Sequence, residues 1–157
     1  MAVEEFVGYE GLISFMEQKA LHTLDGDIIE IGAYMGGGTA KLAAFARRYG
    51  KKVYAVDTFD PRLDRTLGRG GVKASEVYHA FLQGRCMFEV YRDATRDFDN
   101  IVTIKKDSKK VTFPEGQRCC FGFVDGCHQE SYVENDFGLI WPRLVPGGVI
   151  GFHDYEF

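Results

Sequence analysis

The chain has 157 residues, of which 45% are hydrophobic, and a formal net charge of −4. This length and composition fit one globular domain with a substantial core, and they exclude an intrinsically disordered chain. Basic residues are scattered apart from Lys105-Lys106 and Lys109-Lys110. A surface that follows a phosphate backbone is therefore not expected, and we predict no nucleic-acid partner.

The cysteines and the apolar runs indicate the compartment. The chain has four cysteines without a Cys-x-x-Cys pair, and Cys119-Cys120 lie in an apolar run, which is typical of strand residues in a reduced protein. No apolar stretch approaches the roughly 20 residues that span a bilayer, and residues 1–10 lack an export pattern. We therefore expect a cytoplasmic protein without a membrane partner.

Helix and strand patterns alternate along the first half of the chain. Apolar residues recur at helical spacing over residues 10–23, which predicts an amphipathic helix that packs beside a sheet and could cap a ligand pocket. Residues 28–31 and 52–56 are predicted strands, and residues 39–49 form the helix of this βαβ unit. The polar, glycine-rich segment 60–71 is predicted to be a mobile lid.

The second half continues the alternation. Helices are predicted over residues 75–97, with a break near Gly84, and over residues 130–144. Tyr132 and Trp141 of the later helix are interpreted as helix and core packing residues. Three further strands are predicted, at residues 101–104, 121–124 and 149–152.

This order of elements predicts the fold. Pro146-Gly147-Gly148 is expected to turn the chain into the fifth strand. We predict an α/β fold that is Rossmann-like and doubly wound, with a mostly parallel five-stranded sheet in the order 3-2-1-4-5, in a single domain over residues 1–157. A ligand would then lie at the carboxyl ends of the strands, near the point where the strand order reverses.

The first strand leads into a glycine-rich turn. The spacing Glu30-x-Gly32-x-x-x-Gly36 places a carboxylate and glycines where a strand becomes a helix, so the backbone can approach a ligand closely. A dinucleotide fingerprint needs glycine where this chain has Tyr34, and the Gly-Lys-Ser/Thr of a P-loop is missing. A carboxylate here suits the ammonium group of a sulfonium cofactor better than a pyrophosphate. The alternative is a turn that binds nothing.

Two further strand ends carry residues that suit a nucleoside. Asp57 follows the second strand, where a carboxylate can accept both hydroxyl hydrogens of a ribose diol. Alternatively, Asp57 only caps the turn Thr58-Phe59. Asp107-Ser108 follow the third strand and could hold an adenine edge, although the same pair is ordinary turn chemistry.

Acids and histidines follow strands four and five. Asp125 and His128 come after the fourth strand, and His153 and Asp154 come after the fifth. Because neighbouring strands lie about 4.8 Å apart, Asp125 and Asp154 could share a divalent ion such as Mg²⁺, with a histidine nearby as a base. In the alternative interpretation each aspartate caps its own turn, and His153 donates to a backbone carbonyl.

Taken together, the motifs resemble the class I S-adenosylmethionine-dependent methyltransferases over about residues 28–155. They also look like the small-molecule O-methyltransferases related to macrocin O-methyltransferase, because Asp-Gly-x-His is followed by a tyrosine, an aspartate, a tryptophan, Pro-Gly-Gly and His-Asp-Tyr. The motifs are Glu30-Ile31-Gly32 with Gly36 and Thr39, Val56-Asp57-Thr58-Phe59, Lys106-Asp107-Ser108, Val124-Asp125-Gly126-x-His128, Tyr132 with Asp136, Leu144-x-Pro146-Gly147-Gly148, and His153-Asp154-Tyr155.

The resemblance implies an enzyme that methylates a hydroxyl of a small-molecule acceptor, such as a sugar or natural product. It implies that the turn after the first strand contacts the methionine end of S-adenosylmethionine, Asp57 the ribose, and Asp107 with Ser108 the adenine. Asp125 would lie beneath the methyl group, and His153 would be the base. The full set of implied cofactor-binding residues is Glu30, Gly32, Ala33, Tyr34, Gly36, Thr39, Asp57, Thr58, Asp107, Ser108 and Asp125.

The resemblance also implies a metal and reveals a departure. In similar metal-dependent members, acids at the positions of Asp125 and Asp154 bind Mg²⁺, which lowers the pKa of the acceptor hydroxyl. Such folds usually carry two more strands after the fifth, whereas this chain ends at Phe157. We therefore expect a partner subunit of a homo-oligomer, or further chain of a longer protein, to cover the fifth strand. A non-catalytic S-adenosylmethionine-binding module and an NAD-dependent oxidoreductase, which Tyr34 disfavours, are the alternatives.

Overall fold

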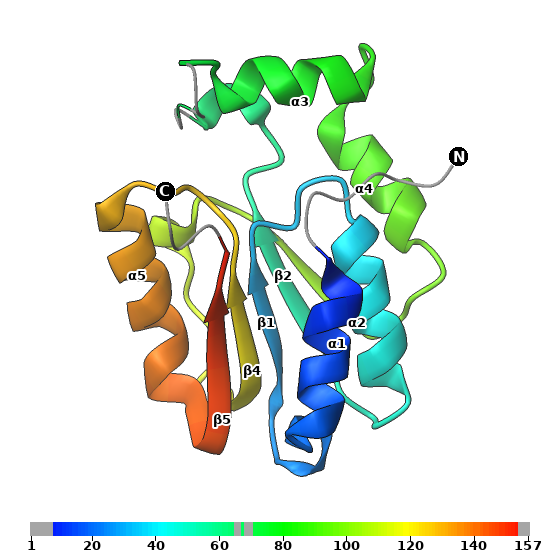
Figure 1. The fold of residues 1–157 in the computed structure, drawn as a ribbon, viewed down its shortest axis with the longest axis vertical. Helices are drawn as coiled ribbons and strands as arrows, with labels where there is room; N and C mark the ends of the chain where they lie inside the picture. The colour runs from blue at the N-terminus through cyan, green and yellow to red at the C-terminus, as the bar shows by residue number, and fades with distance from the viewer. Residues whose placement is uncertain (1–7, 65–66, 68–70, 154–157) are drawn as a thin grey trace.

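The computed structural model describes residues 8–64, 67 and 71–153. They contain one five-stranded sheet in the order β3-β2-β1-β4-β5, and all four strand pairs are parallel. Figure 1 shows α1 and α2 beside one face of the sheet and α5 beside the other. The predicted doubly wound fold and its strand order are confirmed. The strands are β1 (Asp27–Ile31), β2 (Val53–Asp57), β3 (Ile101–Lys105), β4 (Cys119–Val124) and β5 (Leu144–Phe152).

The predicted helices are present, and the end of each follows from local turn chemistry. The helix expected over residues 75–97 divides in two, because Gln83 and Gly84 both have positive φ and reverse the chain. The helix expected over residues 130–144 ends at Ile140 and tightens into a 3-10 turn over Trp141–Arg143, because Pro142 has no backbone N–H to continue the helical hydrogen bonds. The helices are α1 (Tyr9–Gln18), α2 (Gly37–Arg47), α3 (Ala74–Leu82), α4 (Met87–Thr95) and α5 (Glu130–Ile140).

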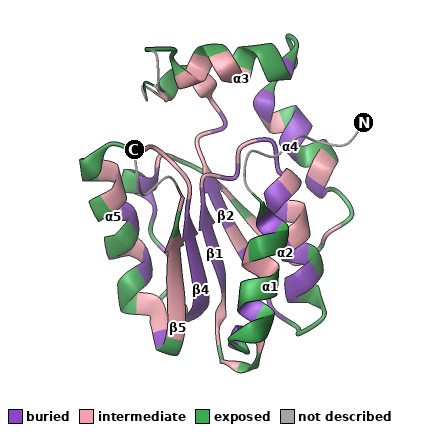
Figure 2. Cartoon of the chain, viewed as in Figure 1, coloured by how far each residue is buried: buried purple, intermediate pink, exposed green. Residues whose placement is uncertain are grey.

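Alternate residues of the central strands face opposite layers. Ile28 of β1 packs in a cluster with side chains of α1 and α2, whereas Ile29 packs in a second cluster with Ile140 of α5. This alternation follows from the two-residue repeat of a strand, and it explains why central strands read as continuous apolar runs. Figure 2 shows the result, with β1 and β4 buried and β5 only half-buried.

The structure corrects the prediction for the fifth strand. Pro146-Gly147-Gly148 do not form a turn before the strand, since β5 already begins at Leu144, which pairs with Cys119. The next partners are Phe121 and Val149, so extra residues of β5 bulge out of register. Gly147 takes a φ of 85° there. Bulges are frequent at sheet edges, and β5 is an edge strand of the described sheet.

Trp141 is also placed differently from the prediction. Its side chain is 59% exposed, so it is not a core residue. Its ring stacks on Phe137, which is itself 40% exposed, at a centroid distance of 5.3 Å. The helical spacing of these aromatic residues therefore indicates a surface stripe beside the edge strand. A partner subunit over that edge stays a prediction.

Among the described helices, none combines the length and the apolar character that crossing a membrane would need.

Candidate functional site

A cavity of about 1070 Å³ lies at the carboxyl ends of the strands, where β1 separates β2 from β4. This is the point at which the strand order reverses, and doubly wound sheets bind ligands there. Pockets of about 300–1,000 Å³ hold a drug-sized ligand, so this cavity is large enough for a cofactor of that size. Nine of the eleven predicted cofactor residues line the cavity: Gly32, Ala33, Tyr34, Gly36, Asp57, Thr58, Asp107, Ser108 and Asp125.

The remaining two predicted residues, Glu30 and Thr39, lie beneath the cavity and are fully buried. The Tyr9 hydroxyl donates to Glu30 Oε1 at 2.8 Å, and the Thr39 hydroxyl donates to Oε2 at 2.5 Å. Burial raises the pKa of Glu30 to about 7. Tyr9 of α1, and not Glu30, lines the cavity. Sequence reasoning expected the first helix near the pocket but did not single out Tyr9, because no motif marks it.

Close contacts within the protein, rather than with a ligand, explain two glycines of the first turn. A Cβ at Gly32 would lie 2.1 Å from the carbonyl oxygen of Asp125, and the φ of Gly32 is +100°. A Cβ at Gly38 would lie 2.2 Å from the ring of Tyr9. Glycine is therefore required at both positions for the β4 loop and α1 to pack against the turn. The close approach of a ligand to Gly32 stays a prediction, and the close neighbour in the structure is the Asp125 carbonyl.

Asp57 joins the turns that follow β1 and β2. Its Oδ2 accepts from the backbone N–H of Tyr34 at 2.8 Å, and its Oδ1 accepts from the N–H of Phe59 at 2.6 Å. The first bond holds Tyr34 at a φ of 49°, in the left-handed region. Burial raises the pKa of Asp57, and the backbone hydrogen bonds oppose this shift. Asp57 therefore caps the Phe59 turn, but it also binds the turn after β1, and the ribose contact stays a prediction.

The predicted adenine edge includes a residue that the sequence interpretation assigned to packing. Asp107 Oδ1 accepts from the backbone N–H of Lys109 at 3.0 Å, which is ordinary turn chemistry. Its Oδ2 accepts from the Tyr132 hydroxyl at 3.2 Å. Tyr132 lines the cavity, and the Lys109 ammonium lies 4.0 Å from the centroid of its ring. Tyr132 is thus a wall of the site, not a core residue.

Asp136 of α5 is a further acid at the site, which the sequence analysis included in the family motif without giving it a role. Its side chain is fully buried, and its carboxylate borders the cavity. Oδ1 accepts from Asn135 Nδ2 at 2.9 Å, whereas Oδ2 has no hydrogen-bond partner within the described part of the chain. Burial raises the pKa of this carboxyl.

The ends of β4 and β5 bring one carboxylate and two imidazoles together. The His153 backbone N–H donates to the carbonyl of Val124 at 3.0 Å, and His153 Nδ1 lies 2.8 Å from Asp125 Oδ1. The imidazole therefore lies at ion-pair distance from a carboxylate, although Nδ1 is not aligned for a hydrogen bond to it. The alternative, donation from His153 to a backbone carbonyl, stays a prediction. The rings of His128 and His153 lie 6.4 Å apart.

The same cluster tests the metal prediction. One ligand atom each from Asp125, His128 and His153 lies within 4.8 Å of the others. A set with two imidazoles is typical of transition metals such as zinc, whereas Mg²⁺ prefers oxygen ligands, so the described donor set does not favour Mg²⁺. The second carboxylate that the prediction needs, Asp154, lies outside the described residues.

The outer wall of the cavity comes from the segment predicted as a lid. Of residues 60–71, the structure describes residues 60–64, 67 and 71. Asp60, Leu63 and Leu67 line the cavity, and α3 continues the wall with Val77 and Tyr78. Figure 1 shows α3 above the carboxyl ends of the strands. Closure of this segment over a ligand stays a prediction.

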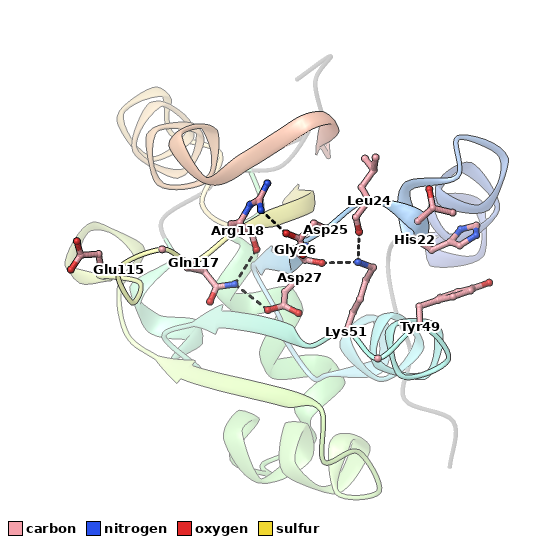
Figure 3. Close-up of a pocket in the computed structure, with 13 residues that line it drawn as sticks. His22, Leu24, Asp25, Gly26, Asp27, Tyr49, Lys51, Glu115, Gln117 and Arg118 are labelled. Carbon is pink, nitrogen blue, oxygen red and sulfur yellow. Dashed lines mark hydrogen bonds and ion pairs between the residues drawn. The ribbon is translucent and has the colours of Figure 1, made fainter.

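A second hollow lies at the other end of the strands, beside their amino ends (Figure 3). Its two cationic side chains bind groups of the protein itself. Lys51 Nζ donates to the carbonyls of Leu24 and Gly26 at 2.5 and 2.8 Å, and Arg118 pairs with Asp25 at 2.5 Å. These groups join the chain segments that enter the strands. The amino edge of a parallel sheet is not the usual place for a ligand, so we interpret these contacts as structural.

A comparison with protein families identifies the domain. A family profile described as "Methyltransferase domain" matches residues 29–155, which is most of the chain. No curated protein matches the sequence significantly.

Several solved structures share the fold at low sequence identity. The N-methyltransferase NodS from Bradyrhizobium japonicum WM9 has a TM-score of 0.56 at 14% identity, with 95% of this chain and 70% of that chain covered. A calicheamicin methyltransferase has a TM-score of 0.60 at 16% identity, with 92% and 63% covered. A putative caffeoyl-CoA O-methyltransferase from Staphylococcus aureus has a TM-score of 0.60 at 13% identity, with 94% and 57% covered.

This chain therefore spans 57–70% of the length of these three proteins. At such identities the likeness shows the fold alone, whereas the family profile covers far more than half of the chain. The chain belongs to the methyltransferase domain family.

Proposed function

We propose that this chain binds S-adenosylmethionine in the cavity at the carboxyl edge of the sheet and transfers its methyl group to a hydroxyl of a small-molecule acceptor. The observation that carries the proposal is the His153–Asp125 pair, which lies in the same cavity as the predicted cofactor residues. The cavity thus combines a nucleoside-binding edge with a base that a carboxylate orients.

The chemistry of the cavity suits the cofactor. S-adenosylmethionine carries a sulfonium, an ammonium and a carboxylate, so its net charge is positive, and the carboxylates of Asp57, Asp107 and Asp125 line the cavity. Asp57 has lone pairs left for a ribose diol after it accepts its two backbone bonds. Glu30 would act on the cofactor indirectly, through Tyr9, because Tyr9 lines the cavity and donates its hydroxyl hydrogen to Glu30.

The His153–Asp125 pair favours oxygen as the acceptor atom. A neutral amine attacks with a free lone pair, whereas an alcohol or phenol must lose a proton as it attacks, so it gains most from a general base. Asp125 contacts Nδ1 of His153 at 2.8 Å, so the other ring nitrogen, Nε2, would accept that proton. The carboxylate also stabilises the imidazolium that results.

The proposed methyl transfer forms one bond as it breaks another. S-adenosylmethionine supplies an electrophilic methyl group: the acceptor oxygen forms a bond to this carbon as the carbon–sulfur bond breaks, which leaves S-adenosylhomocysteine. His153 Nε2 takes the hydroxyl proton and later releases it to solvent. The chain positions the two reactants in line within one cavity, which supplies much of the acceleration in a transfer of this kind.

Two measurements test this proposal. Calorimetry should detect S-adenosylhomocysteine binding to the wild type, and failure to bind would contradict the proposal. With an acceptor that is turned over, His153→Gln should lower kcat by roughly 100-fold or more and leave S-adenosylhomocysteine binding within about twofold. His128→Gln is the matched control, because Asp125 orients His153. An equal loss in both variants would contradict the role of His153, and binding without transfer to any acceptor would favour the non-catalytic module.

A further inference from the structure

The cavity is built from two chemically different halves. The inner half, at the strand ends, is polar, whereas the outer half is formed by aliphatic side chains of the segment between β2 and α3 and of α3 itself. Three of them are strongly exposed although they border the cavity: Leu63 at 61%, Leu67 at 64% and Val72 at 47%. The described aliphatic lining of this half consists of Pro61, Leu63, Leu67, Val72, Ala74 and Val77.

Exposed aliphatic side chains gathered around one cavity indicate a binding surface. Soluble proteins rarely leave a contiguous apolar patch in water unless a ligand or partner covers it. The inner half already contains the residues assigned to the cofactor, so the outer half is left for the second reactant. A molecule that rests against this wall would bury the exposed surface of Leu63, Leu67 and Val72.

The charge of the cavity restricts this second reactant further. Six aspartates line the cavity, of which Asp60 is paired with Arg62 at 2.7 Å, and Lys106 is the only lysine or arginine in the described lining. Coulombic repulsion from the carboxylates disfavours an acceptor that carries a phosphate or carboxylate. A neutral or cationic acceptor meets no such barrier. The six aspartates are Asp57, Asp60, Asp64, Asp107, Asp125 and Asp136.

Tyr78 connects the apolar wall with the acidic inner half. Its ring lies 4.9 Å from the ring of Tyr34, in the turn after β1, and its hydroxyl donates to Asp64 Oδ2 at 2.9 Å. Burial raises the pKa of this phenol, and the carboxylates of Asp64 and Asp125 raise it further. Tyr78, Asp125 and His153 all line the same cavity, so the wall borders the space that the His153–Asp125 pair faces.

We propose that the acceptor is a neutral or cationic molecule with an apolar body, held against the wall of α3 and the preceding segment while its hydroxyl reaches His153. This inference rests on the proposed methyl transfer and specifies its substrate class. Acceptors esterified to phosphate groups, or carrying a free carboxylate beside the apolar body, are disfavoured by the same charges.

A series of phenols with one skeleton and three charges tests the inference. Tyramine is cationic, 4-hydroxyphenylacetamide is neutral and 4-hydroxyphenylacetate is anionic. Calorimetry on the complex with S-adenosylhomocysteine should give tyramine and the amide at least about tenfold tighter binding than the acetate, at low ionic strength. Asp64→Asn should narrow that difference, because it removes one of the carboxylates. Tighter binding of the acetate would overturn the inference.

Variants of the wall test the apolar contact separately. Leu63→Ser should weaken binding of 4-hydroxyphenylacetamide several-fold, whereas Phe81→Ser, on α3 but outside the cavity lining, should not. Equal effects would overturn the inference, as would the absence of binding by all three phenols at millimolar concentration. S-adenosylhomocysteine binding is measured in every sample. If that binding itself is absent, the proposed function fails, whereas intact cofactor binding with the wrong acceptor preference refutes only the substrate class.

Discussion

Replacing the buried acid under the cavity should change how the stability of the protein depends on pH. Glu30 is fully buried, and its pKa is raised from 4.5 to about 7, mainly by burial. An acid whose pKa is higher in the folded state binds its proton more tightly there. Its unfavourable contribution is therefore absent below pH 4.5, grows as the pH rises, and is complete above about pH 7. The shift corresponds to about 3 kcal/mol.

Glu30→Gln removes this titration while keeping the size of the side chain. The amide oxygen can accept from Tyr9, and the amide nitrogen can donate to the Thr39 hydroxyl, so the local hydrogen bonds survive. We expect the free energy of unfolding of the variant, relative to the wild type, to rise by about 3 kcal/mol between pH 4.5 and pH 8.

The assay is urea unfolding at pH 4.5, 6, 7 and 8, with the slope of the transition checked for two-state behaviour. Glu134→Gln, at an exposed position of α5, is the matched control and should follow the wild type at every pH. The reasoning is refuted if the profiles of the wild type and Glu30→Gln stay parallel. Parallel profiles would mean that the pKa of Glu30 is not raised in the folded protein, despite the burial of its carboxylate between Tyr9 and Thr39.

Two other predictions concern the cofactor edge and the first turn. Asp57→Asn should weaken S-adenosylhomocysteine binding about tenfold or more in calorimetry, because a charge-assisted hydrogen bond contributes roughly 1.5–3 kcal/mol; Asp25→Asn, in the hollow at the other end of the strands, is the control, and unchanged affinity in Asp57→Asn would refute the ribose contact. Gly32→Ala should lower the free energy of unfolding by about 2 kcal/mol or more, because its Cβ would meet the Asp125 carbonyl at 2.1 Å. Gly138→Ala, in α5 with no atom within 4 Å of the added Cβ, should instead be stabilising by roughly 0.5–1 kcal/mol in the same thermal or urea assay. If Gly32→Ala lowers the free energy of unfolding by much less than about 2 kcal/mol, the loop after β4 can move away from the added Cβ.

The sequence predicted the fold well because its signals are local. Apolar runs such as residues 28–31 have the β-branched composition of buried parallel strands, and the structure places β1 there. Positive φ at Gln83 and Gly84 divides a helix whose break was expected near Gly84. The fifth strand was misread because Pro146-Gly147-Gly148 are typical turn residues. Only the pairing with β4 reveals that they form a bulge inside the strand.

The site was predicted in part, for a different reason. Residues directly after a strand could be placed, because the carboxyl ends of parallel strands share one edge. Residues that reach the site from elsewhere could not be placed, since no spacing rule connects Tyr9 or Tyr78 with the strand ends. Glu30 is the converse case: its place near the end of β1 was predicted, but the direction of its side chain depends on Tyr9 and Thr39, which meet only in the folded chain.

The two backbone bonds of Asp57 have a consequence for the speed of ligand capture. They fasten the turns after β1 and β2 to one another before any ligand is present. Much of the ordering entropy of these turns is thus lost during folding, not during binding. The nucleoside end of a ligand would meet a finished surface, so its association rate should be set by diffusion and electrostatic attraction, without a slow rearrangement of the turns.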